Sequence, residues 1–206
     1  VIYADELSKL IGVDATRYYL LSEMPHANDG SISYSTIIER FNSDLANTLG
    51  NLVNRTVAMA GKYFGGTVSY KKFENECDLD LLATLKSGVE EYTKAMETFH
   101  NADACGAVLE IAKRCNKYID ETMPWALAKS EENIPRLKTV IYNLLEVIRC
   151  AAVLLKPYIP ETADKIFAQL GTDKTALDTI STFGGLEADK SLGEASTLFA
   201  RIDEAA

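Results

Sequence analysis

Residues 41–56 read FNSDLANTLGNLVNRT and lie inside a pattern that predicts one long amphipathic helix from about residue 33 to residue 63. Largely apolar positions at three- and four-residue spacing mark the buried stripe of this helix: Ile38, Phe41, Leu45, Leu49, Leu52, Thr56 and Met59. Asparagine is a poor helix former because its amide competes for backbone hydrogen bonds, yet four occur here: Asn42, Asn47, Asn51 and Asn54. We therefore expect a surface that recognises hydrogen-bond donors and acceptors.

Asn51 and Arg55 stand out among the polar positions of this helix. At about 100° per residue they fall on one flank of the buried stripe, one turn apart, while Asn47 and Asn54 point further outward. An amide and a guanidinium on one flank can form hydrogen bonds to the same partner. The alternative is that Arg55 pairs with a carboxylate and that the asparagines are simply solvated.

The rest of the chain is also helical in pattern. The same periodicity predicts long helices near residues 79–99, 103–121 and 135–155, and shorter ones at 5–11, 13–23 and 161–170. Turn chemistry is expected over residues 25–31, a helix end at Gly65-Gly66, and a polar linker over residues 67–77. Four long helices with modest connections predict an all-α fold, a helical bundle.

Composition narrows the class of protein. The chain has 206 residues, of which 47% are hydrophobic, and no apolar run approaches the length of about 20 residues that a membrane span needs. The four cysteines form no C-x-x-C pair, so neither a zinc site nor a disulfide framework is expected. A reduced, cytoplasmic setting fits this pattern. The missing initiator methionine and signal peptide are expected of a piece of a longer protein.

The net charge of −9 argues against broad, sequence-independent adhesion to phosphates. It still allows a protein that reads a few unstacked bases with local basic support. Lys113, Arg114 and Lys117 cluster on one segment and are candidates for phosphate contacts. The alternative is an ordinary solvated helix face.

No catalytic constellation is present in the sequence. A di-iron bundle uses two Glu-x-x-His motifs on its helices. This chain has one at the end of a predicted helix, from Glu97 to His100, while the same spacing from Glu23 to His26 is interrupted by Pro25, which stops its helix. There is no P-loop, no G-x-G-x-x-G and no G-x-S-x-G.

Trp125 is the only tryptophan and follows Pro124, where a helix must break. A tryptophan at a helix break can be a core plug or a hinge. It can also be a stacking platform for an unpaired base. Together with Asn51 and Arg55 it would form a reader of single-stranded bases, with polar groups for the base edges and an indole for the face.

Five stretches of this chain resemble, in order, the methionyl-tRNA synthetase family. They are GVDATRYYLL (12–21), residues 41–56, NKYIDETMPW (116–125), the segment 155–160, and LFARI (198–202). The resemblance covers nearly the whole chain. It departs from the family at His26, where an aromatic residue is usual, and at Ala200, where proline is common.

The resemblance implies a class I aminoacyl-tRNA synthetase anticodon-binding bundle at residues 31–171. A stem-contact segment precedes it at residues 1–30, and a tail at 172–206 packs back on it. The family's anticodon readers, an asparagine and an arginine one turn apart plus a tryptophan, fall on Asn51, Arg55 and Trp125.

The resemblance also implies a division of labour between this chain and the parent enzyme. The parent would couple methionine to its tRNA using ATP with magnesium, through an upstream catalytic domain that carries the HIGH and KMSKS signatures and any zinc. This chain would bind methionine tRNA at its CAU anticodon, hold no cofactor and be inactive alone. The alternative function is a helical scaffold that docks proteins.

Overall fold

The computed structural model describes residues 2–24, 30–67, 69–70 and 75–203. The α-helices in these ranges are α1 (Ala4–Ile11), α2 (Val13–Glu23), α3 (Tyr34–Arg40), α4 (Asn51–Phe64), α5 (Glu76–Glu97), α6 (Asn101–Thr122), α7 (Pro124–Leu127), α8 (Ile134–Leu155) and α9 (Pro160–Leu170). Three further helical segments are the π-helix η1 (Phe41–Gly50) and the 3₁₀ segments η2 (Glu131–Asn133) and η3 (Leu177–Ile180). Within the described ranges the β-structure is one isolated bridge between Thr67 and Ser191. The predicted all-α fold is confirmed.

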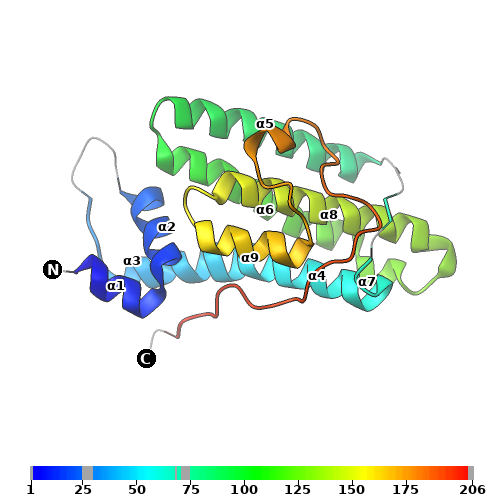
Figure 1. The fold of residues 1–206 in the computed structure, drawn as a ribbon, viewed down its shortest axis with the longest axis horizontal. Coiled ribbons are helices and arrows are strands. Elements are labelled where there is room, and N and C mark those ends of the chain that lie inside the picture. The colour runs from blue at the N-terminus through cyan, green and yellow to red at the C-terminus, as the bar shows by residue number, and fades with distance from the viewer. Residues whose placement is uncertain (1, 25–29, 68, 71–74, 204–206) are drawn as a thin grey trace.

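Helix α8 forms the centre of the bundle. It is apolar almost all round, and from Leu137 to Leu155 nearly every side chain is buried, as expected for a fully enclosed helix. Helices α4, α5, α6 and α9 all pack against it. In Figure 1 the described chain begins and ends at one end of the bundle, beside α1, while α7 lies at the opposite end.

The long helix predicted over residues 33–63 exists as a continuous run from Tyr34 to Phe64, but its middle is not α-helical. Over η1 the backbone forms π-helical turns, and Thr48 Oγ1 donates to the Ser43 carbonyl, five residues earlier, at 2.7 Å. A Cβ at Gly50 would lie 2.9 Å from the Leu45 carbonyl oxygen, so the wide turn leaves no room for a side chain there. The helix ends at Gly65, whose φ of 62° provides the left-handed cap that the sequence predicted.

The remaining helices begin and end close to the predicted residues, with one informative difference. Helix α5 starts at Glu76 rather than near residue 79 because Asn75 and Asp78 form a capping box. The expected turn at residues 25–31 and the expected linker at 67–77 lie partly outside the described residues, and His26 lies outside them entirely.

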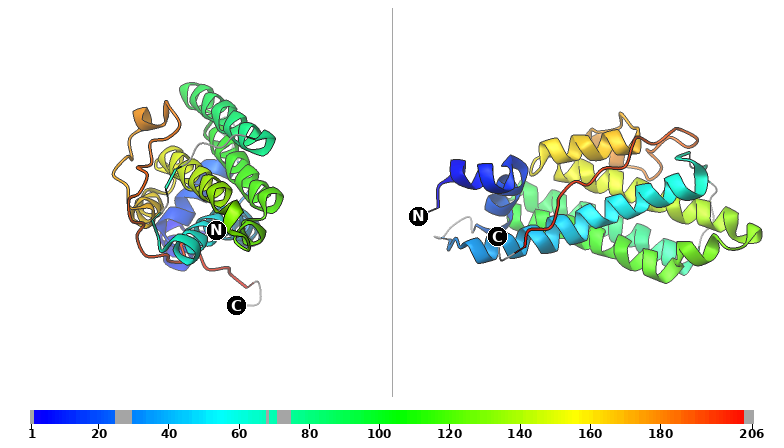
Figure 2. Two further views of the ribbon diagram at one scale, coloured as in Figure 1. Left: turned by 90° about the vertical axis from the view of Figure 1, so that its right-hand side faces the viewer. Right: turned by 90° about the horizontal axis from the view of Figure 1, so that it is seen from below.

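The C-terminal segment returns along the bundle as an extended strap (Figure 2). Near its start, the buried Glu146 carboxylate accepts backbone N–H bonds from Gly184, Gly185 and Leu186 at 3.0, 2.8 and 2.8 Å. Near its end, the Asn42 amide donates to the Ile202 carbonyl at 2.8 Å and accepts from the Ile202 N–H at 2.9 Å. Asn42 was expected on a recognition surface, and this was wrong: it is buried and holds the strap.

Candidate nucleic-acid interface

Asn51 and Arg55 lie in the first turns of α4, directly after the π-helix. Asn51 is exposed, and the Arg55 side chain is 37% exposed. The buried side of the same turns carries Leu52 and Thr56, so the two polar residues occupy the flank that the sequence predicted for them. They are therefore accessible to a partner.

Helix α6 runs beside this flank. Asn116 Nδ2 donates to the Thr48 carbonyl at 3.1 Å, which ties α6 to the end of η1. Further along α6, Asp120 Oδ1 lies 3.9 Å from Arg55 Nη2. Arg55 therefore does pair with a carboxylate, as the alternative interpretation of the sequence expected. The pair contributes little to stability, because Asp120 is 71% exposed and exposed ion pairs are weak. The contact leaves the guanidinium available for exchange with another acceptor.

Trp125 follows Asp120 by five residues, at the turn that joins α6 to α7. Met123 adopts a left-handed conformation with a φ of 45° and ends α6, and Pro124 is the first residue of α7. The Met123 carbonyl then accepts N–H bonds from Ala126 at 2.8 Å and Leu127 at 3.2 Å. Trp125 itself is 43% exposed, so it is not a plug in the core.

The three candidate phosphate contacts differ in their surroundings. Lys113 and Lys117 are exposed on successive turns of α6, and each forms a surface ion pair, to Glu110 at 2.7 Å and to Glu121 at 3.5 Å. They lie on the α6 face that also carries Asp120, because positions i, i+4 and i+7 share one face of a helix. Both remain open to solvent.

Arg114 does not fit a phosphate contact. Its side chain is only 9% exposed and pairs with Asp80 at 2.5 Å and with Glu121 at 2.9 Å. Burial opposes the charged form, but the hydrogen bond to Asp80 and the nearby carboxylates outweigh it and raise the pKa of Arg114. Arg114 therefore joins α5 to α6, and the phosphate contact expected for it is not supported.

A buried polar cluster near this end of the bundle was not anticipated from the sequence. The Asp78 carboxylate accepts hydrogen bonds from Arg136 at 2.5 and 2.9 Å and from the Tyr118 hydroxyl. Burial, followed by the hydrogen bond to Asp78, raises the pKa of Tyr118, so the phenol stays protonated and donates. The sequence contained one signal for it: Asp78 is the third residue of a helix that follows Asn75. That pattern predicts a helix cap and does not predict a buried carboxylate that joins three helices.

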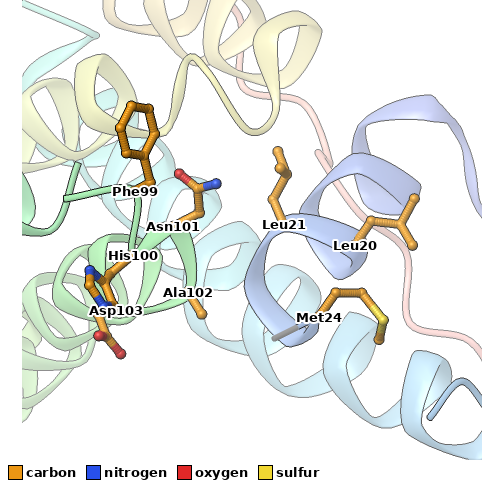
Figure 3. A pocket seen from close by; sticks show the side chains of 8 residues that line it. All are labelled: Leu20, Leu21, Met24, Phe99, His100, Asn101, Ala102 and Asp103. Atoms are coloured by element: carbon orange, nitrogen blue, oxygen red, sulfur yellow. The ribbon is translucent and has the colours of Figure 1, made fainter. Parts of the chain in front are cut away.

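A separate hollow of about 170 Å³ lies between the end of α2 and the start of α6 (Figure 3). Leu20, Leu21 and Met24, at the end of α2, line one side, and residues 99–103, at the start of α6, line the other. None of the anticodon candidates lines it. His100, the histidine of the motif that starts at Glu97, forms a 2.8 Å hydrogen bond with Thr98 Oγ1.

The described residues contain neither a metal-binding cluster nor a membrane-spanning helix. No group of three or more His, Cys, Asp or Glu side chains there could hold a metal ion. Within the same residues, none of the helices has the length and apolar character needed to cross a membrane.

Comparison with known proteins gives a consistent family. The family model described as the anticodon binding domain of methionyl tRNA ligase matches residues 70–206, and that of class I tRNA synthetases (M) matches residues 1–57. The methionine–tRNA ligase of Bacillus subtilis is 44% identical over 196 residues, which cover 93% of this chain and 29% of the relative. That of Clostridium perfringens is 40% identical and is matched over 96% of this chain and 30% of the relative.

Solved structures agree with the sequence comparison. The apo form of Mycobacterium tuberculosis methionyl-tRNA synthetase superposes with a TM-score of 0.93 at 33% identity, over 98% of this chain and 41% of that chain. The same enzyme bound by methionyl-adenylate gives a TM-score of 0.91. The chain spans about 30% of the length of the curated relatives it matches. It belongs to the methionyl-tRNA synthetase family, class I aminoacyl-tRNA synthetases, and contains the anticodon-binding domain of that family.

Proposed function

We propose that this chain recognises the CAU anticodon of methionine tRNA for a parent enzyme that attaches methionine to that tRNA using ATP. The observation that carries the proposal is the contact between Arg55 and Asp120, because it joins the flank of α4 to α6, the helix that ends at Thr122 shortly before Trp125. An exposed amide, guanidinium and indole then stand on neighbouring elements. This combination suits unpaired bases, whose edges and faces are both accessible.

Each side chain has a distinct role in this proposal. The Asn51 amide and the Arg55 guanidinium would hydrogen-bond to base edges, and the loose Asp120 contact would hold Arg55 ready until a base replaces it. Trp125 would stack on a splayed base. Lys113 and Lys117 would meet phosphates, and Arg114 would not.

The division of the chain is part of the same proposal. Residues 31–171 would form the anticodon-binding bundle, residues 172–206 the strap, and residues 1–30 a stem-contact segment. The described part of this last segment packs on the bundle: Asp14 Oδ2 accepts the Thr162 N–H at 2.6 Å, and Arg17 donates to the carbonyls of Pro157 and Tyr158 at 2.6 and 3.3 Å. These bonds would transmit the position of the bound anticodon to the rest of the polypeptide.

The parent enzyme would supply the chemistry. ATP, magnesium and any zinc would be held by its catalytic domain, in the cytoplasm, and this chain alone would not activate methionine. An ATP–pyrophosphate exchange assay tests that point directly. Exchange above background with the 206-residue chain would contradict it.

The proposed function is tested by titrating the chain with an RNA hairpin that carries the CAU anticodon and with a matched hairpin of altered anticodon. We expect the chain to prefer the CAU hairpin. Trp125→Ala should weaken cognate binding by roughly 1–3 kcal/mol, the usual value of an aromatic platform under a base, and circular dichroism should show that the variant stays folded. A folded Trp125→Ala protein that prefers the CAU hairpin as strongly as the unmodified chain does would contradict the role of Trp125 as a stacking platform. If the unmodified chain does not bind RNA, the alternative function of a protein-docking scaffold is favoured.

A further inference from the structure

The connection between α6 and α8 carries Trp125, and both of its ends are tied to one carboxylate. Asp78 lies in the first turn of α5 and is only 1% exposed. Tyr118 lies in the last turns of α6 and Arg136 in the first turn of α8. The described connection between these helices comprises residues 123–133.

The contacts of Asp78 are numerous for a single side chain. Arg136 holds both carboxylate oxygens, with Nη1 donating to Oδ2 at 2.5 Å and Nη2 to Oδ1 at 2.9 Å. The Tyr118 hydroxyl donates to Oδ1, and the Asn75 backbone N–H donates to Oδ2 at 3.1 Å. A two-pronged arginine contact fixes angle as well as distance. This carboxylate therefore joins the end of α6 to the start of α8, in addition to the direct packing of the two helices.

The turn that bears Trp125 has its own internal order. Ala126 and Leu127 donate to the Met123 carbonyl, and the Ala128 N–H donates to the Pro124 carbonyl at 3.0 Å. These local bonds fix the shape of the turn. They do not fix the position of the turn relative to α4, which depends on α6 and on α8, against which α7 packs.

We propose that Asp78, Tyr118 and Arg136 are positioning residues for anticodon recognition, which hold the Trp125 turn at the distance from Arg55 that a bound base requires. The inference rests on the proposed function of Trp125. None of the three residues touches the base. They act by joining α5, α6 and α8 behind the exposed surface.

Trp125 is the only tryptophan of the 206 residues, so its fluorescence reports its surroundings without RNA. The first variant is Tyr118→Phe, which removes one buried hydroxyl from the cluster. Its matched control is Tyr142→Phe, because the Tyr142 hydroxyl is also buried but donates to the Leu186 carbonyl at 2.6 Å, in the strap. We expect Tyr118→Phe to shift the emission maximum of Trp125 and its quenching by acrylamide. Tyr142→Phe should leave both unchanged.

A second variant covers the case in which Tyr118→Phe does not fold. Arg136→Lys retains the positive charge beside Asp78, but an ammonium cannot reproduce the two-pronged contact. It should shift the Trp125 signals in the same way. Unfolding of both variants, or unchanged Trp125 signals in a folded variant, would overturn the positioning role.

Binding to the two hairpins then connects position to recognition. A folded cluster variant should lose about five- to tenfold in affinity for the CAU hairpin, part of the roughly 150-fold that complete loss of a strong stacking platform could cost. The altered hairpin should be affected less. If the unmodified chain prefers the CAU hairpin and the cluster variants prefer it equally strongly, the positioning role fails while the proposed function stands. If the unmodified chain binds the two hairpins equally well, the proposed function fails and this inference fails with it.

Discussion

At the scale of single residues, the guanidinium of Arg55 is the candidate group whose hydrogen-bonding geometry is most restrictive for a bound base. It is partly exposed and its pairing with Asp120 is loose, at 3.9 Å, so it can exchange that acceptor for a base edge. Arg55→Lys should weaken binding of the CAU hairpin about tenfold, because an ammonium retains the charge but cannot make a planar, two-pronged contact. Titration by fluorescence anisotropy measures this loss, and Lys113→Ala is the control, since loss of a phosphate contact should weaken cognate and altered hairpins equally. Equal losses for both hairpins in the Arg55→Lys protein would show that Arg55 meets phosphate and not a base. Spacing on one helix predicted the flank that Arg55 occupies. It could not predict the partner, because Arg55 and Asp120 are joined only by the packing of two helices. The same limit explains Arg114, whose positive charge suggested phosphate but whose burial depends on carboxylates of α5 and α6.

At the scale of elements, the π-helical segment η1 decides how the start of α4 faces its neighbours. The helix itself was predictable from its apolar stripe, but its register was not, because the spacing of Phe41, Leu45 and Leu49 suits wide turns as well as α-helical ones. Gly50 gives a direct test, since a Cβ there would lie 2.9 Å from a backbone oxygen. Gly50→Ala should lower the free energy of unfolding by about 1–3 kcal/mol, as overpacking in a closed space usually does. Gly61→Ala in α4 is the matched control: a Cβ at Gly61 meets nothing within 4 Å, and alanine there should stabilise the helix by up to about 1 kcal/mol. Chemical denaturation of the two variants beside the parent chain measures both values. Similar stabilities for the two alanine variants would argue against the π-helical turns.

At the scale of the whole molecule, net charge and shape together restrict how RNA can bind. The chain carries a net charge of −9, and α7, which bears Trp125, lies at the end of the bundle opposite the described chain ends (Figure 1). The path of the strap to Asn42 and Ile202 could not be predicted, because weakly periodic sequence gives no information about distant partners. An acidic surface repels phosphates except where lysines are exposed, so the contacts should be few: Lys113, Lys117 and, in part, Arg55. The dependence of the logarithm of affinity on the logarithm of salt has a slope of about −0.7 per phosphate neutralised for single strands. We therefore expect a shallow slope of about −1.5 to −2 for the CAU hairpin. Replacing both lysines by alanine should remove most of that slope and leave the preference between hairpins unchanged, because base edges and stacking do not release counterions. Affinities measured at several salt concentrations test this directly. A slope steeper than about −4 would mean that many more phosphates are held than the described basic residues of this surface can supply.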